Sequence, residues 1–239
     1  MSEGKTAAPW GAGLLGGLIG AVAVLLLLFL GAREGLGDRL VREALQRHPE
    51  ILIETADALR EKQHAPVLNA NRAALETPFG SSWEGARDAD VTLVEFYDYA
   101  CGYCKASLPV IDRLLKDDPK LRVVYREFPI LGPESEAAAR LALAASQAGR
   151  FKQFHDTLFA AGRPNEQTLR AAAQAAGIPF TPPQSPAIAA ELQKNYQLAG
   201  QLGASGTPLF VVGDRVLNGA VGYDVLKKAI ADARAKRGA

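Results

Sequence analysis

Two cysteines separated by two residues directly follow an apolar, β-branched run. Residues 91–97 read VTLVEFY, which predicts a buried strand, and Cys101 and Cys104 come within a few residues of its end. Apolar residues then recur at helical spacing from 105 to 116. The order of strand, cysteine pair and helix restricts the chain to folds that place both thiols at the start of a helix beside a sheet.

The rest of the sequence after the cysteine pair predicts further strands and helices. A second strand is predicted over 121–128, a third over 209–212, and a tight turn at Gly213-Asp214 leads into a fourth strand. Helices are predicted over residues 134–161, 166–176, 187–202 and 223–236. The order β-α-β, helical block, β-β-α predicts an α/β protein with a mixed sheet and helices on its faces.

The amino-terminal part carries a long apolar run. Residues 6–32 contain no ionisable side chain, and twenty helical residues span roughly 30 Å, the thickness of a bilayer's hydrocarbon core. We therefore expect a transmembrane anchor over residues 11–32, preceded by an N-terminal tail over 1–10. The alternative is a cleaved signal peptide, although residues 30–32 match a small-residue cleavage site poorly.

Two short amphipathic helices are predicted next, over residues 36–64. Pro49 separates them, because proline suits a first helical turn and disrupts an interior. Their apolar stripes are too narrow to be buried alone, so this helical stalk packs either on the following domain or on a second copy of the chain. Prolines, glycines and serines over residues 65–89 predict a linker.

Charge and cysteine content exclude several classes of protein. The 27 basic and 26 acidic side chains give a net charge of +1, which provides no basic surface for a nucleic-acid partner. Hydrophobic residues make up 48% of the chain, enough for a packed core, so global disorder is excluded. Two cysteines cannot form a disulfide-stapled scaffold.

The position of the cysteine pair favours redox chemistry. Unpaired N–H groups and the helix dipole at a helix start stabilise a thiolate, so Cys101 is the expected nucleophile. Cys104 lies one turn further in and is the expected resolving thiol, which completes a cycle between dithiol and disulfide through a mixed disulfide.

Two alternatives remain for the pair. Half of a zinc site would need further ligands, but His48, His64 and His155 lack a ligand-like spacing to the cysteines, so we expect no metal. Two ordinary buried cysteines would not account for the strand, the helix start and the spacing together.

Two further features accompany the cysteines. Glu95 lies in the middle of the apolar strand, where a carboxylate with a raised pKa can transfer protons for Cys104; a carboxylate facing solvent at a sheet edge is the alternative. Pro208 begins the third strand, and a cis bond there would turn the Thr207 backbone toward an incoming chain, although trans is the commoner isomer.

These motifs together resemble one family. Residues 96–105 and 205–208, and also residues 127–133, are similar to the DsbA family of thioredoxin-fold disulfide oxidoreductases. The resemblance covers about residues 90–235 and implies a thioredoxin fold over 90–239 with a helical insertion at about 134–202. It further implies a redox-active Cys101–Cys104 disulfide in place of a cofactor, and substrate binding at Thr207 and a cis Pro208.

The resemblance also bears on the buried acid. Glu95 stands where such proteins carry an acid near the active site. In DsbA a lysine on the neighbouring strand partners that acid, and here Val124 or Arg126 falls in its place.

Residues 38–59 resemble the stalk of the ScsC-like branch, whose members oligomerise through it. The dipeptide Gly102-Tyr103 is that of the DsbC isomerases. Without a histidine between the cysteines the disulfide should be a weaker oxidant.

We therefore expect a single-pass inner-membrane protein with its catalytic domain in the periplasm. It would isomerise or reduce disulfides in unfolded or misoxidised exported proteins, be reset by a membrane redox partner, and form a homo-oligomer through residues 36–64. A DsbA-type dithiol oxidase and a non-catalytic anchored assembly or chaperone protein are the alternatives.

Overall fold

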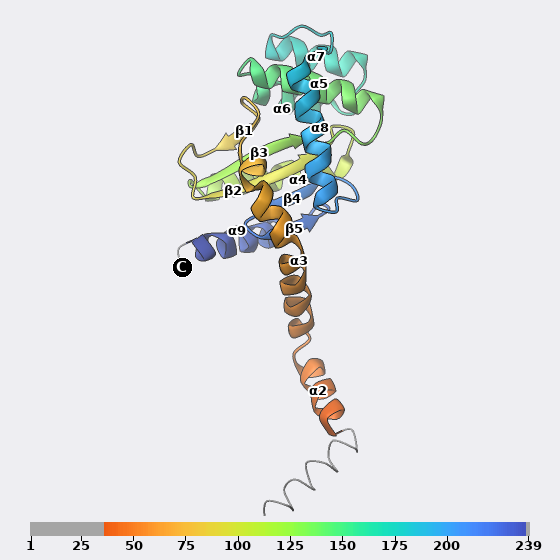
Figure 1. Ribbon diagram of the computed structural model, residues 1–239. Helices are drawn as coiled ribbons and strands as arrows, with labels where there is room; N and C mark the ends of the chain where they lie inside the picture. Colours follow the sequence, from red (N-terminus) through yellow and green to blue (C-terminus); the bar gives the residue numbers. More distant parts are fainter. Residues whose placement is uncertain (1–35, 238–239) are drawn as a thin grey trace, which may run out of the picture. The chain divides into compact units, whose positions relative to one another are not determined.

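A computed structural model describes residues 36–237 of the chain (Figure 1). The expected tail and anchor, residues 1–10 and 11–32, lie outside the described residues. Between residues 36 and 237, no helix combines the length and the apolar character that a membrane span requires. The chain divides into two compact units, Met1–Ala58 and Leu59–Ala239.

The described part of the first unit is helical. Helix α2 covers Leu36–Arg47, and α3 begins at Glu50, so the break expected at Pro49 is present. Apolar side chains here remain exposed, among them Leu52 and Ile53. Exposure of these apolar side chains to water is unfavourable, so another chain could cover this surface.

Helix α3, Glu50–Glu76, differs from the sequence prediction. The expected linker over 65–89 is helical up to Glu76, with Pro66 inside the helix, and Trp83–Gly85 form a short strand, β1. The physical reason is tertiary: Leu68 and Leu75 are buried in a hydrophobic cluster with strand residues, and this burial outweighs the cost of an interior proline.

Five strands form one mixed sheet in the order β1-β3-β2-β4-β5. The central strand β2, Val91–Tyr97, pairs in parallel with β3, Leu121–Glu127, and antiparallel with β4, Leu209–Val212. Strand β1 and the hairpin strand β5, Arg215–Asn218, lie at the two edges. This agrees with the α/β class expected from the element order.

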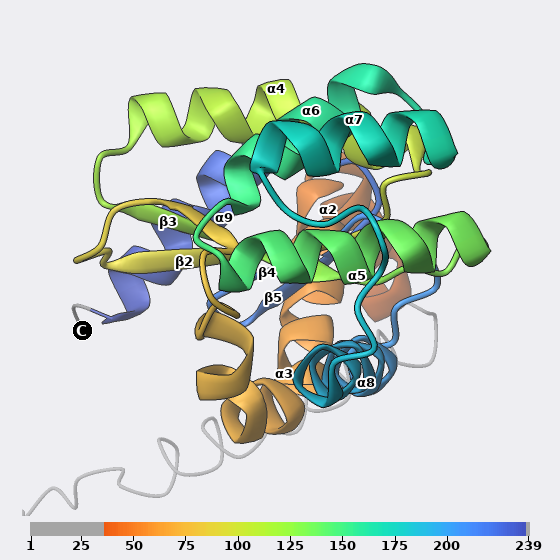
Figure 2. The same cartoon turned by 90° about the horizontal axis from the view of Figure 1, so that it is seen from above.

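Helices cover both faces of the sheet. Helices α4, Gly102–Asp117, and α9, Tyr223–Arg237, pack with one face, while α8, Pro186–Gln201, and the part of α3 within the second unit pack with the other. In Figure 2, α4 and α8 lie on opposite sides of the strands. The buried residues alternate accordingly, with Leu93 and Tyr97 facing α4, and Val94 and Phe96 facing α8.

The helical insertion lies between β3 and β4. Helices α5, Pro133–Gln147, α6, Phe151–Ala161, and α7, Glu166–Ala176, gather on one side of the sheet (Figure 1), and α8 completes the insertion. The single helix expected over 134–161 is two helices, because Gly149 adopts a left-handed φ of 72° between them.

Candidate active site

The two cysteines lie where β2 passes into α4. Cys101 is the N-cap residue of α4 with an extended backbone, and its N–H donates to the Asp98 carbonyl at 3.0 Å. Cys104 is inside the first turn. Both are free thiols, and Cys101 retains 8% exposure against 1% for Cys104. The first thiol is therefore the more accessible, as expected for a nucleophile followed by a resolving thiol.

The loop before β4 meets Cys101. The Thr207–Pro208 peptide bond is cis, and the Cys101 thiol donates a hydrogen bond to the Thr207 carbonyl at 3.3 Å. Residues 106 positions apart in the sequence thus share one site. A backbone carbonyl this close to the sulfur can hold an extended polypeptide beside it by strand-like pairing.

The dipeptide between the cysteines forms the open rim of the site. Tyr103 is 69% exposed, and a Cβ atom added to Gly102 would meet no other atom within 4 Å. The site therefore faces solvent at the position where a foreign disulfide would approach Cys101.

Glu95 is fully buried on the α4 face of the sheet. Strand β2 is central, which excludes the alternative of a solvent-facing carboxylate at a sheet edge. Its Oε1 has no hydrogen-bond partner. Burial raises the pKa of Glu95 well above its ordinary value, and the nearby Cys101 raises it further. Its surroundings therefore favour the neutral form of the Glu95 carboxyl, a group that can exchange a proton beside the cysteines.

Cys104 is coupled to the same acid. Burial raises the pKa of the Cys104 thiol, and the charge of Glu95 adds to the effect. A buried thiol that resists ionisation needs a proton acceptor close by before it can attack a mixed disulfide. The ionisation of Cys104 therefore depends on the charge of Glu95.

Neither residue expected in place of the DsbA lysine faces Glu95. Val124 and Arg126 both lie on the opposite face of the sheet, toward α3 and α8. Arg126 donates to Glu191 at 2.6 Å and to the carbonyls of Leu75 and Thr77. The charge of Glu95 is consequently not balanced by an arginine on β3.

Asp98 is a positioning residue that the sequence patterns did not single out. Its buried carboxylate accepts hydrogen bonds from the N–H groups of Ala100 at 2.7 Å, Ile130 at 2.8 Å and Leu131 at 2.9 Å. It thereby fixes the loop before Cys101 to the loop after β3. Its place three residues before the first cysteine was the only local signal, because two of its three donors are more than thirty residues away.

A second buried polar cluster lies on the α4 face of the sheet. The Tyr97 hydroxyl donates to the Glu127 carboxylate and lies 3.0 Å from the Tyr99 hydroxyl, and Tyr99 lies 3.2 Å from Nδ1 of His155. Burial raises the pKa of Glu127 well above its ordinary value and lowers the pKa of His155 to about 3. His155 thus belongs to a core network, and the described part of the chain holds no group of three or more His, Cys, Asp or Glu side chains suited to a metal ion.

Comparisons with known proteins identify the family and the fold. Residues 92–231 match the model of the DSBA-like thioredoxin domain. A solved thioredoxin-like oxidoreductase from Silicibacter pomeroyi is 38% identical, with a TM-score of 0.63 over 69% of this chain and 98% of that one. A Proteus mirabilis ScsC linker-deletion mutant is 31% identical, with a TM-score of 0.67 over 86% of this chain and 96% of that one.

Among curated relatives, the Na(+)/H(+) antiporter NhaA 1 of Salinispora arenicola is 30% identical over 62% of this chain. The chain spans only 24% of the length of that relative. The fold comparisons confirm the expected thioredoxin fold, and the family match extends over more than half of the sequence. The chain therefore belongs to the DSBA-like thioredoxin domain family and is similar within it to ScsC.

Proposed function

We propose that the chain is a thiol–disulfide oxidoreductase that isomerises or reduces disulfides in exported polypeptides through Cys101 and Cys104. The observation that carries this proposal is the placing of the Cys101 thiol at the start of α4, 3.3 Å from the Thr207 carbonyl, beneath an exposed Gly102-Tyr103 rim. The nucleophile and a backbone acceptor for a bound chain are side by side, as the reaction requires.

The chemistry follows from the two thiols. The Cys101 thiolate attacks one sulfur of a substrate disulfide, which forms a mixed disulfide and releases the other substrate sulfur as a thiolate. In reduction, Cys104 loses its proton to the Glu95 carboxylate and attacks Cys101, which frees the second substrate thiol and leaves a Cys101–Cys104 disulfide. In isomerisation, a substrate thiolate attacks the mixed disulfide instead and regenerates Cys101.

Exposed apolar residues beside the site support a polypeptide substrate. Tyr103 is joined by Ile130 and Leu131, which are 40% and 48% exposed and whose N–H groups bind Asp98. Because Asp98 also contacts the backbone of Cys101, these side chains border the cysteine site. Unfolded chains present apolar segments that such a surface can cover.

The dipeptide favours reduction or isomerisation over oxidation. A strongly oxidising pair such as that of DsbA, at about −120 mV, depends on strong stabilisation of the reduced form. Gly102 and Tyr103 carry no positive charge that would add to this stabilisation. A dithiol oxidase is the second candidate, and the resemblance to DsbA favours it.

The experiment uses the full chain in detergent. We expect it to reactivate scrambled ribonuclease, and a Cys101→Ser variant to lose this activity completely. The reduction potential of the pair should lie well below −120 mV. A chain that only oxidises reduced substrates supports the oxidase, and full cellular function in Cys101→Ser would support a non-catalytic anchored protein.

The proposal includes the location and assembly of the chain. The apolar run at residues 11–32 anchors it in the inner membrane with the catalytic domain in the periplasm, where a C-x-x-C pair is not held reduced. A membrane redox partner resets the pair. Residues 36–64 join copies of the chain, and the exposed apolar side chains of α2 and α3 support this role: Leu40, Val41, Ile51, Leu52, Ile53 and Leu59.

A further inference from the structure

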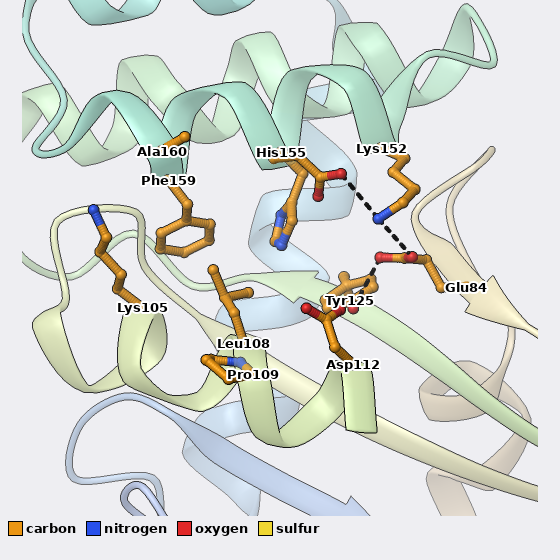
Figure 3. Close-up of a pocket in the computed structure, with 11 residues that line it drawn as sticks. Glu84, Lys105, Leu108, Pro109, Asp112, Tyr125, Lys152, His155, Phe159 and Ala160 are labelled. Atoms are coloured by element: carbon orange, nitrogen blue, oxygen red, sulfur yellow. Dashed lines mark hydrogen bonds and ion pairs between the residues drawn. The ribbon is translucent and has the colours of Figure 1, made fainter. Parts of the chain in front are cut away.

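Tyr99 connects the loop before Cys101 to the helical insertion. It is buried, and its ring packs on α6, with centroid distances of 4.8 Å to Phe159, 5.6 Å to His155 and 6.0 Å to Phe154. Figure 3 shows His155 and Phe159 extending from α6, where their rings lie 4.9 Å apart. The residue two positions before the nucleophile is therefore held by the insertion and not only by the sheet.

The Tyr99 hydroxyl lies in the middle of a hydrogen-bonded chain of buried side chains. Nδ1 of His155 lies 3.2 Å from it on one side, and the Tyr97 hydroxyl lies 3.0 Å from it on the other. Tyr97 in turn donates to the Glu127 carboxylate. Burial raises the pKa of both tyrosines well above its ordinary value, so each hydroxyl keeps its hydrogen and has only that one to donate.

Counting these hydrogens fixes the direction of the chain. Tyr97 gives its hydrogen to Glu127, so its contact with Tyr99 uses the hydrogen of Tyr99. Tyr99 then has none left for His155, so Nδ1 of His155 must carry a hydrogen and donate to the Tyr99 oxygen. Burial lowers the pKa of His155 to about 3, so the ring is neutral and Nε2 carries no hydrogen.

The other ring nitrogen agrees with this assignment. Nε2 of His155 is buried and has no hydrogen-bond partner. In the assigned tautomer it is an unpaired acceptor, whereas in the other tautomer it would be an unpaired N–H, which is the rarer arrangement in protein interiors. The direction of the chain and the surroundings of Nε2 therefore point to the same tautomer.

The loop that carries the nucleophile is held from two sides. The Asp98 carboxylate binds N–H groups of the loop after β3, and the next residue, Tyr99, is bound by α6. The Cys101 N–H donates to the Asp98 carbonyl at 3.0 Å, so a shift of Tyr99 is passed on to Cys101. Such a shift changes the place of the Cys101 sulfur relative to the Thr207 carbonyl, and small misplacements of a reacting group slow its reaction.

We propose that His155 is a positioning residue for thiol exchange, whose Nδ1–H binds the Tyr99 hydroxyl and thereby holds the Cys101 sulfur beside the Thr207 carbonyl. The inference rests on the function proposed above in one respect, that Cys101 is the attacking thiol. It applies equally to reduction, isomerisation and oxidation. His155 acts through Tyr99 and touches no substrate.

The test measures the single-turnover reaction of the pre-reduced full chain, in detergent, with oxidised glutathione. Cys101 attacks one glutathione sulfur, which forms a mixed disulfide and releases one reduced glutathione. Leucine and asparagine have similar shapes, so His155→Leu and His155→Asn leave similar cavities, but only the asparagine amide can donate to Tyr99. We expect His155→Leu to react about 5- to 10-fold more slowly than the wild-type chain, the contribution of one hydrogen bond, and His155→Asn to recover most of the rate.

Two tyrosine variants separate positioning from stability. Tyr99→Phe removes the hydroxyl that accepts from His155 and should slow the reaction as much as His155→Leu does. Tyr125→Phe removes a hydroxyl from the same aromatic cluster, which donates to Glu84 at 3.1 Å and takes no part in the chain (Figure 3). Its unfolding free energy in urea should fall by a similar amount, but it should keep the wild-type rate.

Nitrogen NMR of the histidine-labelled full chain tests the tautomer without any change to the protein. The chain has three histidines, His48, His64 and His155, and the signals of His155 are those absent from His155→Asn. We expect the hydrogen on Nδ1 at neutral pH. A hydrogen on Nε2 would overturn the inference.

The reaction rates give two further outcomes against it. Wild-type rates in both His155→Leu and Tyr99→Phe, or an equal loss of rate in Tyr125→Phe, would overturn the positioning role. Failure of the proposed function looks different, because a Cys101→Ser chain that reacts as fast as the wild type would remove Cys101 as the nucleophile.

Discussion

Glu95 lies opposite Tyr125 in the parallel register of β2 and β3, so an aromatic side chain stands where a cation could have neutralised the buried carboxylate. On the other side of β2 its register partner is Phe210. Arg126, the next residue on β3, points to the other face and binds Glu191. The site therefore keeps a carboxyl whose neutral form is favoured by its surroundings.

Replacing Glu95 by glutamine should change how stability depends on pH. The folded-state pKa is raised, so the stability from this group is fully present below about 4.5 and is lost as pH rises toward the folded pKa. The wild-type chain should lose about 1.4 kcal/mol of unfolding free energy per pH unit in that window, and Glu95→Gln should not. Urea denaturation at a series of pH values measures the difference.

Glu127, whose pKa is also raised, is present in both chains, so its contribution cancels in this comparison. Glu95→Gln should also slow the release of substrate from the mixed disulfide, because Cys104 loses its proton acceptor. Identical pH slopes in the two chains would contradict a raised pKa for the buried Glu95.

His155 should produce the opposite pH dependence. Its pKa is lowered to about 3 by burial, so the stability from the neutral ring is present above its ordinary value of 6.5 and is lost as pH falls toward 3. His155→Phe should remove a slope of about 1.4 kcal/mol per pH unit in this window, whatever it does to stability at pH 7. If the unfolding free energies of the wild-type chain and of His155→Phe fall equally as the pH is lowered, the ring is not buried in its neutral form.

Arg126 should be costly to remove alone. Its guanidinium and Glu191 are 1% and 5% exposed, so Arg126→Met removes the buried partner of the Glu191 carboxylate and leaves it only the half-exposed Lys194. We expect a loss of about 3 kcal/mol in unfolding free energy, at the lower end for a broken buried ion pair because Lys194 remains beside Glu191, and a partial recovery in the Arg126→Met, Glu191→Met double variant. A double variant no more stable than the single one would assign the loss to the α3 carbonyls that Arg126 also binds.

Asp98→Asn tests the anchoring of the cysteine loop. The amide retains one acceptor oxygen but turns N–H groups toward backbone donors, so at least one of the three hydrogen bonds is lost. We expect a loss of about 2 kcal/mol in unfolding free energy and slower thiol exchange at Cys101. An exchange rate equal to that of the wild-type chain would mean that the loop is fixed by other contacts.

The stalk proposal predicts a change of mass. Leu52→Glu combined with Ile53→Glu places charges on side chains that are 56% and 65% exposed, and should convert an oligomer into a monomer in analytical ultracentrifugation of the full chain in detergent. Gln174→Glu, an exposed position on α7 outside residues 36–64, should leave the mass unchanged. A wild-type chain that is itself monomeric would contradict self-association.

Local patterns were sufficient for the elements around the cysteines. The apolar run before Cys101 and the helical spacing after it gave β2 and α4, and Thr207-Pro208 before a short strand gave the second half of the site. These features depend on neighbours in the sequence. Asp98 and His155 were missed as members of the site and its surroundings because their partners are far away along the chain.

The error at α3 has the opposite origin. Pro66 is a reliable helix breaker when only local preferences act, but Leu68 and Leu75 gain more by packing against the sheet than the proline costs. Likewise, β1 forms because Trp83 pairs with Val124 on β3. A strand of three residues that depends on so distant a partner cannot be predicted from its local sequence.

The contact between Arg126 and the end of α3 has a consequence for where the chain can be cut. Carbonyl groups of Leu75 and Thr77 accept from the guanidinium, so the segment before β1 completes the solvation of a cation inside the catalytic body. Removal of the residues before 90 would take away the Leu75 and Thr77 carbonyls that bind the Arg126 guanidinium. It would also expose the apolar surface on which Leu68 packs. A fragment that folds stably must therefore begin before Leu68, within α3.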